Sequence, residues 1–238
     1  MWRDWIVLKR RLTKFIFSRL VTPILYLTAF GVGLGKNIQM QSGTYLEFLV
    51  PGIIALNTMN VSYMSIISVH AEKIYHKSLE EYLTAPISSA AYVAGKINSA
   101  VIRAIISTIL ILFVAFIFGA GLNFFSSVGN ILNFFCVVVL NSIIFAGIGF
   151  CAALRVQSYE ELAQVNTYIL VPMSFLCGTF FSTSQLPEAL KIFIEILPLT
   201  QTSELLREGF NFFSFGILIL YAVILIYFSC REFKKLIE

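Results

Sequence analysis

Charged residues are scarce in this chain: Asp, Glu, Lys and Arg make up 13% of its 238 residues. Ordinary soluble domains carry roughly 25% charged residues and 45–50% apolar ones, whereas hydrophobic residues reach 58% here. A soluble fold of this length would leave much of that apolar surface in water. The shortage of charge therefore excludes a soluble domain and indicates an integral membrane protein.

Sequence motifs for metal binding, nucleotide binding and covalent catalysis are also missing. The cysteines fall singly within apolar runs, so they are predicted to be small apolar filler rather than disulfides or metal ligands. The sequence has no G-x-x-x-x-G-K-[ST] phosphate loop, no H-E-x-x-H and no G-x-S-x-G. We therefore expect no cofactor on this chain and no enzyme activity of its own.

Ionisable residues are few inside the apolar runs, where Glu47 and Arg103 are placed near predicted span ends. The polar residues there are mostly amides and hydroxyls, which interhelical hydrogen bonds usually account for. Some can instead line a substrate pathway, and the candidates are Asn57, Asn60, Tyr63, Asn141, Tyr168 and Phe175. The spans contain too few ionisable residues for a proton or sodium relay. An ion-gradient-driven secondary carrier or channel is therefore kept only as the alternative function.

Apolar runs near 20 residues are abundant, and about 20 helical residues cross the hydrocarbon core of a bilayer. The runs predict an all-α membrane protein, one transmembrane domain over 1–238, with six transmembrane helices at 20–35, 48–70, 97–119, 131–154, 162–181 and 211–230. Pro172 and Gly178 interrupt the fifth run, which membrane helices tolerate when neighbours satisfy the freed backbone groups.

The basic residues are divided unequally between the two sides of this arrangement. One side receives Arg103, Arg155 and the basic residues of the N-terminal segment, the 71–96 connection and the C-terminus, and the other receives only Lys36, Lys191 and Arg207. The positive-inside rule then places both termini in the cytoplasm, as an even number of spans requires. The predicted location is the cell inner membrane, as a multi-pass protein.

The segment 1–19 has two faces at helical spacing. Its apolar face carries Trp5, Leu8, Leu12, Phe15 and Ile16, and its basic face carries Arg3, Arg10 and Lys14. This pattern is typical of an amphipathic helix lying in the membrane interface. Charges that merely orient the first span are the less favoured alternative.

Two connections are long enough to carry function. In 71–96, Tyr75, Leu79, Tyr82 and Leu83 form one apolar stripe on a helix that Pro86 should end. A groove on a soluble cytoplasmic partner would cover this stripe, and packing on the protein's own bundle would do so equally well.

In 182–210, two amphipathic pieces at about 187–197 and 200–210 are divided by Pro198, and Pro187 suits a first helical turn. Each piece is too short to span. A re-entrant hairpin in the outer leaflet and an ordinary external loop both fit this composition.

Four stretches together carry a resemblance to a known family: VTPILYLTAFGVGLG, YLEFLVPGIIALNTM, EKIYHKSLEEYLTAPISSAAYVAGK and FLCGTFFSTSQLPEALKIFIEILPLTQTSELLREGF. In their order and spacing the chain resembles the membrane (permease) subunit of type-2 ABC exporters, such as nodulation-factor, daunorubicin-type drug and polysaccharide export permeases. The last stretch, with G-T-F-F, L-P, P-L-T and a following Glu and Arg, is the most specific.

The resemblance implies partners and roles that the residue patterns do not. The 71–96 connection would hold a coupling helix around 78–86 that docks on an ATP-binding cassette subunit, where ATP and Mg are bound. Its expected contact residues are Glu72, Ser78, Leu79, Glu80, Glu81, Tyr82, Leu83 and Pro86. The sequence departs from relatives at Lys77–Ser78, where a glycine is frequent. The resemblance also favours the re-entrant hairpin over the loop.

The implied transporter contains two such membrane subunits, with a homodimer favoured over a heterodimer, among membrane lipids and without nucleic acid. The expected function is ATP-driven export of an amphipathic substrate, such as a lipid-linked glycan, a glycolipid or a hydrophobic drug. Few intramembrane charges and the 23 Phe suit such a cargo. The expected bending points are Pro172, Gly178, Pro187 and Pro198.

Overall fold

The computed structural model describes residues 2–34, 44–75, 78–84, 87–120, 127–180 and 187–236, and within these ranges the chain is helical with no β-strand. Five helices are long and apolar enough to cross a membrane: Leu12–Gly31, Tyr45–Ile74, Ser89–Ile117, Val128–Arg155 and Phe212–Lys234. The prediction of an all-α, multi-pass membrane protein is therefore confirmed.

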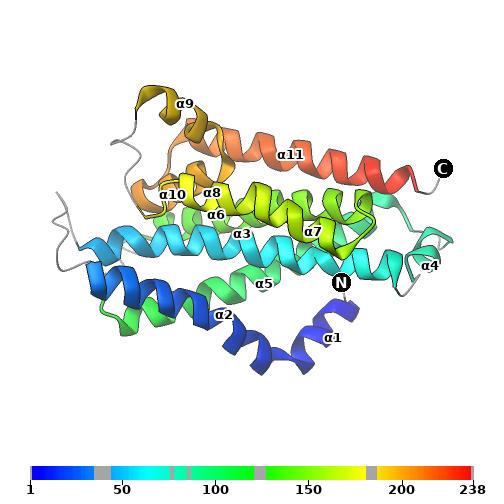
Figure 1. Cartoon of the computed structure of the whole chain (residues 1–238), viewed down its shortest axis with the longest axis horizontal. Helices are drawn as coiled ribbons and strands as arrows, with labels where there is room; N and C mark the ends of the chain where they lie inside the picture. The colour runs from blue at the N-terminus through cyan, green and yellow to red at the C-terminus, as the bar shows by residue number, and fades with distance from the viewer. Residues whose placement is uncertain are drawn as a thin grey trace.

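The long helices lie side by side around α3 (Tyr45–Ile74), as Figure 1 shows. α3 packs against α5 (Ser89–Ile117) and α6 (Val128–Arg155), and α11 (Phe212–Lys234) covers the other side of α6. Thr44 and Glu47 form a capping box at the start of α3, and the Ser88 hydroxyl caps α5 by accepting from the Ala91 N–H. α3 is thus the central element, and its buried face sets the position of the others.

The N-terminal segment is not the single helix predicted over 1–19. α1 (Trp2–Arg10) ends before Arg11, and α2 (Leu12–Tyr26) continues into the π-helix η1 (Leu27–Leu34). The span predicted to begin at residue 20 therefore belongs to a helix that begins earlier, at Leu12. Tertiary contacts account for the break, because the buried Leu8 and the Asp4–Lys96 ion pair hold α1 against the bundle.

The predicted fifth span, 162–181, is built from three consecutive pieces: α7 (Tyr159–Val165), the π-helix η3 (Asn166–Leu170) and α8 (Val171–Leu176). It is not among the five span-like helices. Pro172 lies in the first turn of α8, directly after η3, and Gly178 adopts a left-handed backbone with φ of 70°. Residue 181 lies outside the described ranges.

The 182–210 connection contains α9 (Glu188–Ile196) and α10 (Pro198–Glu208). Pro187 directly precedes α9, Pro198 is the first residue of α10, and the division at Pro198 is as predicted. α10 packs against α3, α6 and α11, whereas α9 leaves Ile192 and Phe193 exposed.

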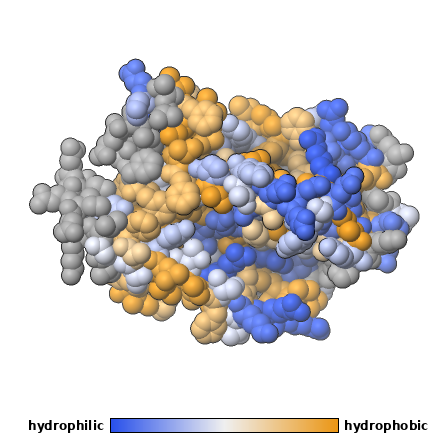
Figure 2. Space-filling model, in the orientation of Figure 1, coloured by the Kyte–Doolittle hydropathy of each residue, from blue (hydrophilic) through white to orange (hydrophobic). Residues whose placement is uncertain are grey.

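The two ends of the bundle differ in character. α1, the C-terminal end of α11 and the short helix α4 (Ser78–Thr84) lie toward one end, and α9 and α10 lie at the other (Figure 1). Hydrophilic residues gather toward the α4 end in Figure 2, while much of the rest of this face is apolar. The predicted basic side and the predicted outward side thus correspond to opposite ends of the molecule.

Candidate functional site: the α4 junction

Two residues of the apolar stripe predicted for the coupling helix, Leu79 and Tyr82, are covered by the protein itself. Leu79 is 3% exposed and packs in a cluster with residues of α3, α5, α6 and α11. Tyr82 is half-buried against the same cluster, with its ring 5.2 Å from that of Tyr92. Of the two arrangements that the sequence left open for these residues, packing on the bundle is the one observed. Tyr75, which precedes α4, is exposed.

α4 therefore presents a different surface from the one its stripe predicted. Glu80 and Glu81 are exposed in its first turn, so the outward face is acidic. Ser78 and Leu83 belong to α4 by their backbone, and Pro86 lies outside the described ranges. Any partner that binds α4 meets these carboxylates first.

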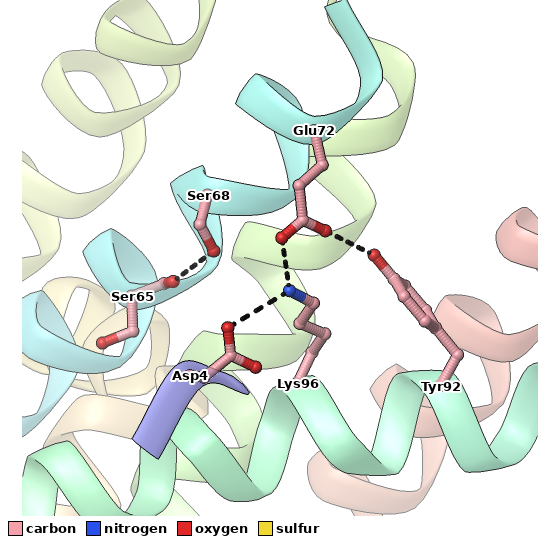
Figure 3. Close-up of polar contacts among 6 residues, drawn as sticks. All are labelled: Asp4, Ser65, Ser68, Glu72, Tyr92 and Lys96. Atoms are coloured by element: carbon pink, nitrogen blue, oxygen red, sulfur yellow. Dashed lines mark hydrogen bonds and ion pairs between the residues drawn. The ribbon is translucent and has the colours of Figure 1, made fainter. Parts of the chain in front are cut away.

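Behind α4 lies a buried cluster of charges from three helices, drawn in Figure 3. The Lys96 ammonium of α5 is 2.8 Å from Glu72 Oε1 of α3 and 3.5 Å from Asp4 Oδ1 of α1. The Tyr92 hydroxyl donates to the other carboxylate oxygen of Glu72 at 2.9 Å. Lys96 and Glu72 are buried, and a buried charge is tolerated only when it is paired and hydrogen-bonded.

The Tyr92 ring extends this cluster to two more helices. It stacks on Phe233 of α11 with centroids 4.5 Å apart and planes at 14°, and it contacts Tyr82 of α4. The Lys96 Nζ also lies 5.7 Å from its centroid. Asp4, Glu72, Tyr82, Tyr92 and Lys96, the α4 junction, therefore join α1, α3, α4, α5 and α11.

Two further contacts fix the end of α3 on α6. The His70 imidazole lies 3.2 Å from the Ala153 carbonyl oxygen, and the Lys73 ammonium donates to the Leu154 carbonyl. Because side chains of α4 pack on the neighbouring helices, those helices would either resist a displacement of α4 or move with it.

The sequence indicated only part of this junction. Glu72 was placed at the base of the coupling helix, but Asp4, Tyr92 and Lys96 were not assigned a role. One signal was available, since Tyr92 and Lys96 are four residues apart and share a helix face. Their acidic partners on α1 and α3 become neighbours only through tertiary packing.

The predicted pathway residues fall into different environments. Tyr63 is fully buried, and its hydroxyl donates to the Leu162 carbonyl at 3.1 Å. Asn141 is fully buried too, donating to the Thr58 hydroxyl at 2.6 Å and accepting from Thr202 at 3.1 Å. Both side chains serve interhelical hydrogen bonding in this conformation. Tyr168 and Phe175 are exposed at the surface of η3 and α8.

Asn57 and Asn60 line a cavity of about 290 Å³ between α2, α3 and α8. The Asn57 amide donates to the Ser107 hydroxyl at 2.6 Å, and the Asn60 amide donates to the Leu56 carbonyl at 3.0 Å. They are the two predicted pathway residues that line this cavity, which opens to the surface at Ser18 and Thr22 of α2.

A second charge, half-buried, lies at the opposite end of the bundle, on α10. The Arg207 guanidinium donates to the carbonyl oxygens of Phe48, Gly178 and Thr179 at 2.8–3.0 Å and lies 3.8 Å from the centre of the Phe48 ring. Burial lowers the pKa of Arg207 to about 10, so the side chain stays protonated at neutral pH. We call Arg207 and these carbonyls the Arg207 clamp.

The described residues contain no group of three or more His, Cys, Asp or Glu side chains that could hold a metal ion. The arrangement offers paired charges and stacked rings between helices rather than a nucleophile with an adjacent base. Its chemistry suits the transmission of a movement.

Comparisons with known proteins agree on one family. Residues 1–211 match the family described as "ABC-2 type transporter". The chain is 26% identical over 191 residues to the inner membrane transport permease YadH of Escherichia coli (strain K12), covering 80% of this chain and 73% of the relative. It is 27% identical over 207 residues to nodulation protein J of Rhizobium meliloti (strain 1021), covering 86% and 77%.

Nodulation protein J of Bradyrhizobium diazoefficiens is 25% identical over 207 residues, again covering 86% of this chain and 77% of the relative. A family match over residues 1–211 of 238 shows membership. Permeases of this family work with ATP-binding subunits. With its several membrane-length helices, the chain belongs to the ABC-2 type transporter family and is a membrane permease subunit of an ABC transporter.

Proposed function

We propose that this permease is the membrane subunit of an ATP-driven exporter of an amphipathic substrate, with its α4 junction serving as the coupling point to the ATP-binding subunit. The observation that carries the proposal is the position of α4, which exposes Glu80 and Glu81 while Leu79 and Tyr82 pack on the bundle. A partner that moves α4 would therefore also move the helices joined at the junction.

The proposed topology has six spans, with the α4 end in the cytoplasm and the α9–α10 end outward. The continuous helical run from α7 through α8 would form the fifth of these spans, and α9 with α10 a re-entrant hairpin. The burial of α10 among α3, α6 and α11 supports this hairpin, because backbone that turns at membrane depth requires shielding by protein. Homodimers would then complete the transporter in the inner membrane.

The substrate class follows from the character of the spans. Pathway candidates are amides, hydroxyls and rings rather than paired acids and bases, which suits a cargo with a large apolar part. The expected bending points Pro172, Gly178, Pro187 and Pro198 lie at or next to the ends of short helical pieces, and these are the positions at which the bundle would flex during transport.

The test removes the acidic face of α4 and leaves its packing intact. The double variant Glu80→Gln, Glu81→Gln keeps Leu79 in the core, and we expect it to insert normally but to lose most co-purification of the ATP-binding chain and most transport-coupled ATP hydrolysis. The matched control, Glu188→Gln with Glu195→Gln, removes the same charges from α9 at the opposite end. Normal coupling in the α4 variant would refute the docking role. ATP-independent, ion-dependent transport would favour the secondary carrier.

A further inference from the structure

Arg19 of α2 is a cation without an acidic partner in the described part of the chain. It lines the cavity between α2, α3 and α8, and its Nε is buried without a hydrogen-bond acceptor. The ring of Phe15 lies 5.7 Å from its guanidinium carbon and offers only a weak interaction. A partly buried guanidinium has a strong requirement for an anion.

A second arginine increases this requirement. Arg103 of α5 lies close enough to Arg19 for their charges to repel each other, and its Nε is also buried without a partner. The predicted span placed Arg103 near a helix end, but α5 begins at Ser89, so Arg103 lies near the middle of the helix. Asp4 of α1 attracts the Arg103 charge, but no acidic side chain among the described residues acts on Arg19 in this way. An anion bound near the two guanidinium groups would relieve their repulsion.

The rest of the cavity wall supplies neutral hydrogen-bonding groups. These are the side chains of Ser18, Thr22, Asn57, Asn60 and Ser174. Asn57 and Asn60 each use one amide N–H within the protein, and an amide nitrogen carries two hydrogens, so one remains on each. Arginine with hydroxyl and amide donors is the set that binds phosphate oxygens.

The cavity changes character along α2. Tyr26, two helical turns beyond Arg19, lines it as well and begins a group of aromatic rings. Its centroid is 5.4 Å from that of Phe180, which lies 4.8 Å from Phe30 and 6.4 Å from the exposed Phe175. A cationic end and an aromatic end on one helix match the two ends of an amphiphile.

The size of the cavity decides which part of such a molecule it could enclose. At about 290 Å³ it lies at the lower limit of small-molecule sites, roughly 300–1,000 Å³. We propose that it binds the anionic, phosphate-bearing head group of an amphiphile whose tail lies against the Tyr26, Phe30, Phe175 and Phe180 rings. This inference rests on the proposed transport function in taking the amphiphile to be cargo, and binding itself requires no ATP.

The test measures binding of phosphatidylglycerol against phosphatidylcholine with the same acyl chains, by native mass spectrometry of the delipidated full chain. We expect wild type to prefer the anionic lipid by about tenfold and Arg19→Gln to lose that preference, as for removal of a charge-assisted hydrogen bond. Lys14→Gln, which removes an exposed charge from the same helix, should retain it. An unchanged preference in Arg19→Gln, or an equal loss in Lys14→Gln, would overturn the site.

Two further variants keep the test decisive if Arg19→Gln folds poorly. Arg19→Lys keeps the charge without the planar fork and should retain part of the preference, and Thr22→Val should weaken it by a factor of about three, as for one neutral hydrogen bond. Wild-type affinity in both would count against the proposal. Displacement of the lipid by the same concentration of sodium phosphate would assign the site to a free anion and overturn the amphiphile.

A second experiment tests whether the bound lipid is transported cargo or a structural lipid. In proteoliposomes of the complex with its ATP-binding subunit, ATP-dependent movement of labelled phosphatidylglycerol that is lost in Arg19→Gln would identify cargo. Binding without movement would retain the anion site and assign it to a structural lipid. Since the binding assay contains no ATP, its failure is distinguishable from failure of α4 docking.

Discussion

Each end of this permease holds a positive charge between its helices, but the two charges have different partners. At the α4 junction, Lys96 meets the carboxylates of Glu72 and Asp4. In the Arg207 clamp, the guanidinium meets the backbone carbonyls of Phe48, Gly178 and Thr179. Ion pairs between side chains can be exchanged when helices move, whereas a carbonyl moves only with its backbone. The junction is therefore suited to rearrangement, and the clamp anchors the irregular segment from which α8 would bend at Gly178.

The largest effect is expected from breaking the clamp. Arg207→Ala leaves the carbonyls of Gly178 and Thr179 without this donor and removes the contact with the Phe48 ring, so we expect a loss of about 4 kcal/mol in the free energy of unfolding. Unfolding in mixed SDS micelles measures it. Arg155→Ala, which removes an exposed arginine paired with Glu232 at 2.8 Å, should cost far less, because solvent screens an ion pair at the surface. Equal losses in the two variants would contradict the clamp.

At the α4 junction, we expect the effects of two substitutions on the free energy of unfolding not to add. Lys96→Met leaves Glu72 and Asp4 without the ammonium between them, and an uncompensated buried charge costs about 3 kcal/mol. Adding Glu72→Gln should recover part of the loss, because the stranded carboxylate is then neutral. Unfolding of the two single variants and the double variant in the same micelles tests the coupling. Strict additivity would show that the two side chains act independently.

The contrast also shows what sequence could predict. Hydropathy placed the long helices because apolar runs near 20 residues have few other stable structures in a bilayer. The break at Arg11 was missed because the apolar pattern continues across it, while the contacts that hold α1 involve Lys96, far along the chain. Likewise, the covering of Leu79 could not be decided from its helix alone, because its neighbours come from α3, α5, α6 and α11.

Polar residues illustrate a second limit. Asn141 and Asn57 both fall within apolar runs, and both were candidate pathway residues. In the structure Asn141 is enclosed by Thr58 and Thr202, whereas Asn57 lines a cavity. Sequence shows that each amide requires a partner, but only packing shows whether a helix or an internal space supplies it. Sequence likewise placed Arg207 in the 182–210 connection but could not show its partners, because the carbonyls that accept its hydrogen bonds lie on α3 and after α8.

The smallest effect separates the hydroxyl of Tyr92 from its ring. Tyr92→Phe retains stacking on Phe233 and the ion pair between Lys96 and Glu72, and it removes one hydrogen bond to a carboxylate, so we expect a loss of about 1–2 kcal/mol in the same unfolding assay. Tyr92→Leu, which removes the ring too, should cost more because contacts with Tyr82 and Phe233 are lost. If the two variants were equally destabilised, the ring would contribute nothing to stability, and the link from α4 to α11 would depend on the other side chains of the cluster, such as Leu79.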